Sequence, residues 1–275
     1  MSYENLTIAV AVNDMGVFRN NLGLSPDISN GGRNQVVIKE GFSSASHAYN
    51  TVLKEAENEI IVFVHQDVYL PEKWISGLRG WFSYLEKESI NWGVLGCFGS
   101  RKSAEGGLGR IYTTGLGLHG RKITRPEPVE TLDEIVLILR KSSGLMFDPA
   151  LPHFHLYGVD ICMSARDKGM ICYALPAFCI HNTNQLLDLP KEFYTCYRHI
   201  KNKWRRFLPI YASCTKISRF DGEVHFRKIR ALFGKALRRK RVPKLRVKDP
   251  RTVLGGEGHG SGIGGRPEVA PCRSL

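Results

Sequence analysis

EIIVFVHQDVYLPEKW, residues 59–74, is the stretch that decides the fold. Its first half is an uninterrupted apolar run, 60–64, which is typical of a buried strand. The run stops at three polar residues, His65, Gln66 and Asp67. In open α/β sheets, ligands bind just beyond the carboxyl ends of the strands. We therefore expect these side chains to line a binding site; the alternative is that Asp67 only begins a loop or caps the next helix.

The segments on either side of this strand alternate between strand and helix patterns. Apolar runs predict further strands at 6–12, 34–40 and 92–99. Between them, apolar residues recur at helical spacing from Ala45 to Ala56, with Ser43 or Ser44 as the N-cap. A second helix is expected to begin near Pro71 and to run to about Leu85. This alternation predicts parallel strands joined by helical crossovers.

The second half of the chain is less regular. Residues 100–130 are rich in glycine and basic residues, which is typical of a long loop with short strands. After this loop the sequence predicts a strand at 133–141, a short helix at 158–169, strands within 170–175 and 178–182, and a helix at 190–208. We therefore expect one α/β domain over residues 1–210.

The positive charge of the chain is concentrated in one segment. The 275 residues have a formal net charge of +13, and residues 226–251, with twelve Lys or Arg and one acidic residue, contribute +11 of it. We expect 211–251 to form a basic helical extension and the glycine-rich 252–275 to be disordered. An apolar stripe beside the basic residues would suit an anionic membrane surface. A solvated tail is the alternative, and nucleic-acid binding is not favoured.

Other features of the sequence point to a cytoplasmic protein. The N-terminal MSYENLTIAVAVNDMG lacks the regions of a signal peptide, and no apolar run approaches the length of about 18 residues that a membrane span needs. The seven cysteines are scattered and odd in number, as reduced thiols are. If the basic segment does bind lipid, we expect peripheral attachment at the inner face of the membrane.

Four polar motifs are spaced along the predicted domain. They are Asn50 in the first helix, His65-x-Asp67 at the strand end, Asp160 with Arg166 in YGVDICMSARDKG (157–169), and His181 in FCIHNTNQ. In this order they resemble the nucleotide-sugar-dependent glycosyltransferases of the GT-A fold, in the family-2-like group, over about residues 6–185. The segments VETLDE (129–134) and FHLYGVD (154–160) are similar to its streptomycin-biosynthesis-type members.

The resemblance implies a Rossmann-like mixed sheet, mainly parallel and flanked by helices, that binds a nucleotide-sugar donor. It implies that the donor is contacted by Asn50, His65, Gln66 and Asp67. It also implies that Asp67, His65 and His181 hold a divalent metal, Mn²⁺ or Mg²⁺, beside the diphosphate. Carboxylate oxygen suits both ions, and imidazole suits Mn²⁺-like ions.

The chain departs from the family pattern at two places. His65 replaces the first acid of an Asp-x-Asp motif, and Tyr157 and Gly158 replace an acidic pair that carries the general base. A base must accept the proton of the acceptor hydroxyl if transfer occurs in one inverting step. The remaining candidates for the base are, in order, Asp160, His155 and Asp133.

These features predict an enzyme, a hexosyl- or related transferase, which moves a sugar from a nucleoside diphosphate to an unidentified acceptor. A glycan or a lipid-linked acceptor would suit the membrane interpretation. One alternative is a catalytically degenerate protein that only binds a nucleotide or a glycan, which the missing acidic pair favours. The other is a sugar-phosphate nucleotidyltransferase, for which NDMGVFRNN after the first strand is a poor phosphate loop.

Overall fold

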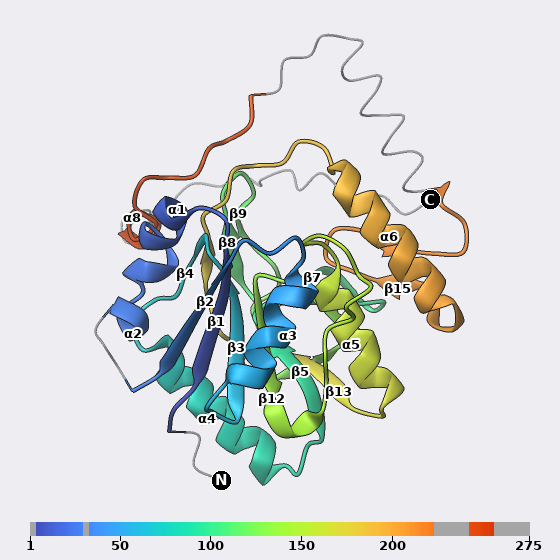
Figure 1. Ribbon diagram of the computed structural model, residues 1–275, viewed down its shortest axis with the longest axis horizontal. Coiled ribbons are helices and arrows are strands. Elements are labelled where there is room, and N and C mark those ends of the chain that lie inside the picture. Colours follow the sequence, from blue (N-terminus) through green and yellow to red (C-terminus); the bar gives the residue numbers. More distant parts are fainter. Residues whose placement is uncertain (1–3, 30–32, 223–241, 256–275) are drawn as a thin grey trace, which may run out of the picture.

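The computed structural model describes residues 4–29, 33–222 and 242–255. At its centre is a seven-stranded sheet with the strand order β10-β13-β5-β12-β3-β1-β2 (Figure 1). In that order the strands are Glu127–Val129, Ile171–Ala174, Trp92–Gly96, Val136–Arg140, Ile60–His65, Thr7–Val12 and Gln35–Glu40. The strand predicted at 60–64 is therefore β3, in the middle of the sheet.

Five of the seven central strands run in the same direction. β1 pairs in parallel with both β2 and β3, and β13 pairs in parallel with β5. β12 runs antiparallel between β3 and β5, and β10 runs antiparallel to β13 at the edge. The prediction of a mixed, mainly parallel α/β sheet is confirmed.

Short strands build three smaller sheets around this centre. They are β4-β14-β8-β9 (Val68–Tyr69, Ile180–His181, Ile111–Thr113, Gly117–His119), β11-β6-β7 (Thr131–Leu132, Gly99–Arg101, Ala104–Leu108) and β15-β16 (Ile210–Tyr211, Lys216–Ile217). The predicted glycine-rich loop with short strands at 100–130 is confirmed. These sheets matter for function because β4 and β14 lie directly beyond the carboxyl end of β3.

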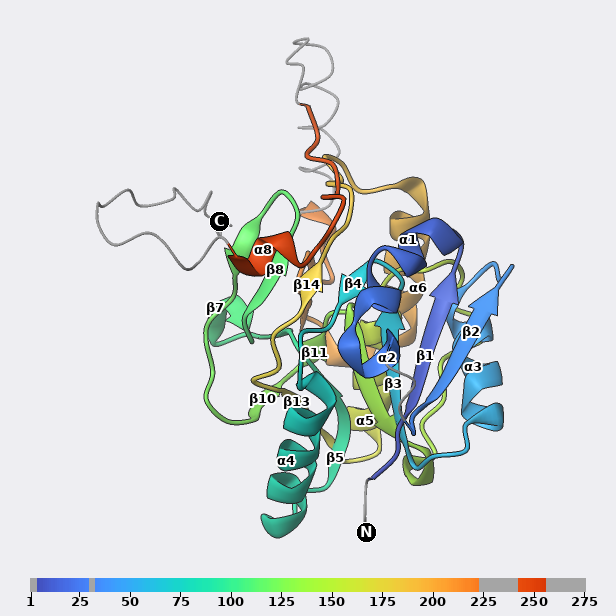
Figure 2. The same cartoon turned by 90° about the vertical axis from the view of Figure 1, so that its left-hand side faces the viewer.

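Helices cover both faces of the central sheet. They are α1 (Met15–Arg19), α2 (Pro26–Ser29), α3 (Ala45–Glu55), α4 (Trp74–Lys87), α5 (Tyr157–Asp167), α6 (Lys191–Lys203) and α8 (Thr252–Gly255), with 3-10 turns at Leu22–Leu24, Lys141–Ser143 and Arg205–Phe207. Figure 2 shows α3 and α4 on opposite sides of the sheet. Successive residues of a strand point to opposite faces. In β3, Phe63 packs in the core with α3 and α5, whereas Val64 packs in the core with α4.

Two helix starts test the predicted caps. Ser44 caps α3, since its hydroxyl accepts a hydrogen bond from the backbone N–H of His47 at 3.3 Å. The start predicted for α4 is wrong by three residues: Pro71 lies in a turn, and the helix begins at Trp74. The reason is that Lys73 has a left-handed backbone with φ of 64°, so regular helix can begin only after it.

The basic helical extension is wrong where the structure describes it. Residues 210–217 form the β15-β16 hairpin, and 242–248 contain no helix. Pro243 cannot donate a backbone hydrogen bond, and the backbone of its neighbour Lys244 is bonded to Gln185 instead. Most of the predicted apolar and basic stripe, 223–241, and nearly all of the predicted disordered tail, 256–275, lie outside the described residues; 252–255 form α8.

In the described part of the chain, every helix is too short or too polar to cross a lipid bilayer. The predicted boundaries between a domain of 1–210, an extension and a tail stay predictions.

Candidate functional site

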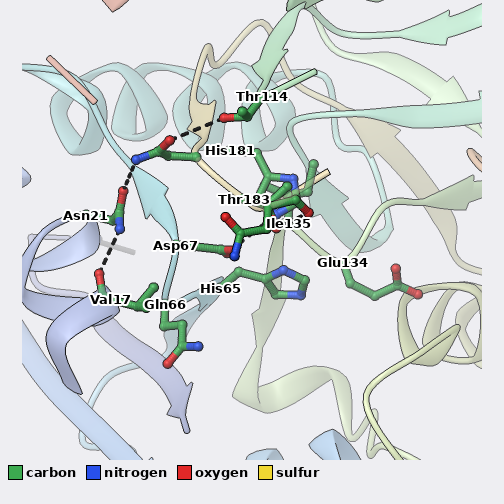
Figure 3. A network of polar contacts seen from close by, with 12 residues as sticks. Val17, Asn21, His65, Gln66, Asp67, Thr114, Glu134, Ile135, His181 and Thr183 are labelled. Atoms are coloured by element: carbon green, nitrogen blue, oxygen red, sulfur yellow. Dashed lines mark hydrogen bonds and ion pairs between the residues drawn. The ribbon is translucent and has the colours of Figure 1, made fainter. Parts of the chain in front are cut away.

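The end of β3 brings His65 and Asp67 together with His181, which lies 114 residues further along the chain (Figure 3). His65 is the last residue of β3, and β4 begins directly after Asp67. β14 pairs antiparallel with β4 and places His181 opposite Val68. The backbone N–H of Asn182 then donates to the backbone oxygen of Asp67 at 2.8 Å. This pairing of two-residue strands builds the cluster.

The three side chains have the chemistry of a metal site. One ligand atom from each of His65, Asp67 and His181 lies within 4.8 Å of the others, and His181 Nε2 is 3.4 Å from Asp67 Oδ1. A bound ion would need ligand atoms at roughly 2.0–2.2 Å, so small rotations would close the site around it. Two imidazoles and one carboxylate fit Mn²⁺ better than Mg²⁺, which prefers oxygen alone.

The protonation of the cluster suits a cation. Burial alone would raise the pKa of Asp67, but the adjacent His181 and His65 hold it well below its ordinary value. Burial lowers the pKa of His65, so its ring stays neutral and keeps a lone pair. Burial would lower the pKa of His181, but the adjacent Asp67 carboxylate raises this pKa above its ordinary value. An arriving cation would take the place of the proton on His181.

Tyr157 holds the ring of His65 from behind. The Tyr157 hydroxyl lies 2.8 Å from His65 Nε2 and donates a long hydrogen bond, 3.4 Å, to the backbone oxygen of Glu134. This contact fixes the direction of the His65 ring. Outer partners of this kind fix the tautomer and the direction of metal-binding histidines.

Gln66 points away from the cluster and ties β3 to the loop after β1. Its Oε1 accepts from the backbone N–H groups of Asn13 at 3.0 Å and Asp14 at 3.2 Å, and its Nε2 donates to the Asn13 side chain. This bonding fixes the end of the strand. The donor contact predicted for Gln66 stays a prediction.

Glu134 is a candidate that the sequence reading missed. It lies in the turn between β11 and β12, half-buried, and its Oε1 accepts from the backbone N–H of Gly158 at 3.2 Å. Gly158 lies in the first turn of α5, so the carboxylate sits at the positive end of the helix. Burial nevertheless raises its pKa to about 8, and the neighbouring Asp133 adds to the shift. A carboxyl with this pKa is well matched to general-base work near neutral pH.

Gly158 explains how Glu134 reaches this place. A Cβ built on Gly158 would lie 2.7 Å from the backbone oxygen of Leu132 and 3.1 Å from Cγ of Glu134. A side chain at position 158 would therefore collide with the backbone oxygen of Leu132 and crowd the Glu134 side chain. The resemblance puts an acid of the family at position 158, and here the carboxylate of Glu134 occupies the adjoining space instead. Glu134 and Gly158 are 24 residues apart, so only their contact in the structure points to Glu134. In the sequence, the nearest residue proposed as a base was its neighbour Asp133.

The predicted base Asp133 lies near the site but is engaged elsewhere. Its Oδ1 accepts from the backbone N–H of Ile135 at 3.2 Å, and its Oδ2 accepts from the Ser213 hydroxyl at 2.5 Å. It does not begin β12, which starts at Val136, but stands in the turn before it. Its charge acts on both His65 and His181, so it contributes to the negative potential of the cluster.

His155 and Asn50 are placed away from the metal-type cluster. The ring of His155 packs edge-on against Phe193 of α6, with centroids 5.8 Å apart, and burial lowers its pKa. The Asn50 amide exchanges two hydrogen bonds with the backbone of Phe147, at 2.7 and 3.0 Å. Both bonds give Asn50 a structural role, and its predicted contact with the nucleotide stays a prediction.

The structure gives Asp160, the first-choice base, a structural role, and its predicted role as base stays a prediction. Its side chain is buried, with 1% exposed, and both oxygens are used. Oδ1 accepts from Trp204 Nε1 at 2.6 Å, and Lys203 Nζ lies 2.9 Å from Oδ2. A hydroxyl of a substrate cannot reach such a carboxylate. Asp160 instead joins the start of α5 to the end of α6.

We expect Asp160→Asn to lower stability and to leave chemistry intact. The change removes the charge that faces Lys203 and Trp204, so the free energy of unfolding should fall by about 1–3 kcal/mol. Urea unfolding would measure it. Turnover per folded molecule should be unchanged. A large loss of turnover at unchanged stability would restore Asp160 as the base.

Comparison with known proteins gives distant similarity over most of the chain. A curated protein from Fuscovulum blasticum, named ATP synthase subunits region ORF 6, is 26% identical over 166 residues, 58% of this chain and 66% of that protein. Among solved structures, the chain is similar to S. aureus TarS 1–349 (16% identity, TM-score 0.44, 72% of this chain and 65% of that one). It is also similar to a mannosyltransferase from Pyrobaculum calidifontis in complex with GDP-Man and Mn²⁺ (14%, 0.42, 75% and 65%).

These similarities are too low to transfer a ligand or an acceptor to this chain, which spans no more than 66% of the length of any of the three proteins. A family model is more informative. It matches residues 27–202, well over half of the chain, and this span contains His65, Asp67, Glu134 and His181. The model describes a glycosyltransferase-like family, in agreement with the resemblance drawn from the sequence. The chain belongs to this glycosyltransferase-like family.

Proposed function

We propose that the protein transfers a sugar from a nucleoside diphosphate to a hydroxyl of an acceptor, with a divalent cation at His65, Asp67 and His181. The observation that supports it best is the pairing of this cluster with a second carboxylate, Glu134, of raised pKa. Tyr157 joins the two parts, since its hydroxyl contacts His65 and the backbone of Glu134. Glycosyl transfer needs both a cation for the leaving group and a base for the acceptor.

The chain's own residues would act as follows. The acceptor oxygen forms a bond to the anomeric carbon while the bond from that carbon to the diphosphate oxygen breaks, and its electron pair leaves with the diphosphate. The acceptor proton passes to the Glu134 carboxylate. A divalent ion, when bound, would neutralise the charge that develops on the diphosphate. Attack opposite the leaving group inverts the anomeric configuration, so we propose an inverting enzyme.

The first test is calorimetric binding of UDP, GDP and dTDP, each with and without Mn²⁺. The proposal expects one of them to bind, and to bind more tightly with the ion. Binding without any dependence on Mn²⁺ would remove the metal from the proposal but keep the transferase. A chain that binds none of the three would favour the degenerate alternative, and pyrophosphate release from a nucleoside triphosphate would favour the nucleotidyltransferase.

His65 should determine which ion the site prefers. His65→Asp replaces imidazole by carboxylate, and we expect the ratio of Mn²⁺ to Mg²⁺ affinity to fall by at least about tenfold, because Mg²⁺ prefers oxygen ligands. Titration of each ion in the presence of the nucleotide would measure it.

Tyr157→Phe is the matched control for His65→Asp. It removes only the hydroxyl that holds His65 Nε2, so both ions should bind more weakly, by about 10-fold, with their ratio unchanged. An unchanged ratio in His65→Asp as well would mean that His65 is not a ligand.

The acceptor is proposed only as a class: a hydroxyl-bearing glycan or lipid-linked glycan. A hexosyl donor, a cytoplasmic location and binding of the basic segment to an anionic membrane stay predictions. Loss of membrane association on removal of 226–275 is the result that the last of these requires.

A further inference from the structure

The described end of the basic segment is tied to the chain that follows His181. Residues 242–251, hereafter the strap, run beside the segment that follows β14 (Figure 2). The backbone of Lys244 donates to Gln185 Oε1 at 3.1 Å, and the backbone of Gln185 donates to Lys244 oxygen at 2.9 Å. The N–H of Arg246 donates to Asn184 Oδ1 at 3.0 Å. The strap is thus bound through its backbone, which leaves its basic side chains available for other work.

Asn182 anchors the strap at the edge of the candidate site. Its fully buried amide donates to the backbone oxygen of Val247 and accepts from the N–H of Val247, each at 2.8 Å. The same amide donates to Asn21 Oδ1 at 2.8 Å. Asn182 directly follows His181, and its own N–H is bonded to the backbone of Asp67. One residue therefore fixes the strap and the metal-type cluster relative to one another.

Arg246 has buried donors that nothing in the described structure accepts. Its Nε and Nη1 are shielded from solvent and have no hydrogen-bond partner among the described residues. An unpaired buried donor destabilises the folded protein, and more so when the group is charged. Its backbone N–H is bonded to Asn184, three residues after the metal-type ligand His181. By contrast, Arg251 on the same strap is exposed and paired with Asp249 at 2.7 Å.

We infer that Arg246 binds the diphosphate of the donor, and that the part of the strap around it, 244–247, forms one wall of the donor site. The inference rests on the proposed function. A guanidinium presents its N–H groups as a rigid fork that matches phosphate oxygens, and it is less strongly hydrated than an ammonium. A diphosphate held by the cation at Asp67 and His181 on one flank would supply acceptors to Arg246 on the other. The Arg246 charge would then stabilise the departing diphosphate.

This role would also explain why a basic segment far along the chain belongs to the enzyme body. The strap contributes backbone bonds to Asn182, Asn184 and Gln185, directly after a metal-type ligand, and one cation to the site. The strap would then act at the donor site, and this role does not depend on residues 223–241.

The test compares Arg246→Gln with Lys248→Gln, which removes the same charge from an exposed position of the strap. The probes are whichever of UDP, GDP and dTDP the wild type binds most tightly and the monophosphate of the same nucleoside, by calorimetry with Mn²⁺. Arg246→Gln should weaken binding of the diphosphate by about tenfold or more and binding of the monophosphate much less, since the variant loses its charge-assisted hydrogen bonds to the diphosphate. Lys248→Gln should bind both as the wild type does.

Arg246→Lys is the control for misfolding, because it keeps the positive charge and loses only the forked N–H groups of the guanidinium. Its diphosphate affinity should fall between those of the wild type and Arg246→Gln. Equal diphosphate affinity in Arg246→Gln and Lys248→Gln would overturn the inference and leave the proposed function standing. Equal losses for diphosphate and monophosphate in both Arg246 variants would also overturn it. A wild type that binds no nucleotide would overturn the proposed function, and the inference with it.

Discussion

Glu134→Gln is expected to lower the turnover of sugar transfer by about 10²–10⁴-fold, the usual contribution of a positioned general base. Gln has the same shape, and its side-chain oxygen can still accept from the N–H of Gly158. The variant therefore loses the proton acceptor and little else. Because Glu134 lies outside the metal-type cluster, the affinity for the nucleoside diphosphate should be unchanged. Steady-state transfer and calorimetry on the same preparation would measure both quantities.

The matched control for this variant is Asp133→Asn, at the neighbouring acid. Asp133 is bonded to Ile135 and Ser213, so its loss should affect turnover far less than that of Glu134. If Asp133→Asn lost the larger share of turnover, the base would be Asp133 rather than Glu134. Loss of nucleotide binding in Glu134→Gln would show that the substitution disturbs the donor site as a whole.

The pH dependence gives a second readout of the same group. Glu134 acts as a base only when ionised, and its pKa is raised to about 8. For the free enzyme, kcat/KM should rise about tenfold per pH unit below this pKa and level off above it. Glu134→Gln should remove that limb. A wild-type profile that is flat between pH 6 and 9, ~3 units across the expected pKa, would count against Glu134.

As the pH rises, the free energy of unfolding should fall while the activity increases. The folded pKa of Glu134, about 8, is above its ordinary value of 4.5, so the folded protein binds the extra proton between these two values. Its contribution to stability is complete below 4.5 and is lost as the pH rises through about 8. The wild type should therefore lose stability relative to Glu134→Gln as the pH increases over this window. Urea unfolding at several pH values would show it.

Asp67→Asn should abolish the benefit of Mn²⁺ for nucleotide binding. Asp67 is the one carboxylate among the three clustered ligands, and its neighbours keep it ionised. Loss of an outer-shell partner alone costs about 10–100-fold in metal affinity, so loss of this ligand should cost roughly 100-fold or more. Nucleotide affinity without metal should be the same in the variant and the wild type. This metal-free measurement is the internal control for folding.

Two results would contradict the role given to Asp67. If Mn²⁺ still strengthened nucleotide binding in Asp67→Asn to the wild-type extent, the ion would be bound elsewhere. If the metal-free affinity also collapsed, the variant would have lost the site itself, because Asp67 is 9% exposed and accepts from Asn182 through its backbone. Thermal unfolding of the variant separates the second case from the first.

The sequence by itself determined the secondary structure that positions the site. The apolar run at 60–64 is long enough for one buried strand, and its polar ending marks the carboxyl edge of the sheet, where β3 places His65 and Asp67. Hydrophobic period and caps are local properties, so the order of strands and helices along the chain could be predicted with errors of a few residues, as at α4. The metal-type cluster, His65, Asp67 and His181, was likewise predicted, through the family resemblance.

Only the tertiary structure decided which carboxylates are free to react. Asp160 and Glu134 are both acids near the start of α5, but Asp160 is buried against Lys203 and Trp204 from α6, whereas Glu134 rests on the N–H of Gly158. The position of the strap could not be predicted either, because it depends on a hydrogen bond from the Asn182 amide to Val247, 65 residues further along the chain. Burial and pairing are set by contacts between distant segments, and neither periodicity nor spacing encodes them.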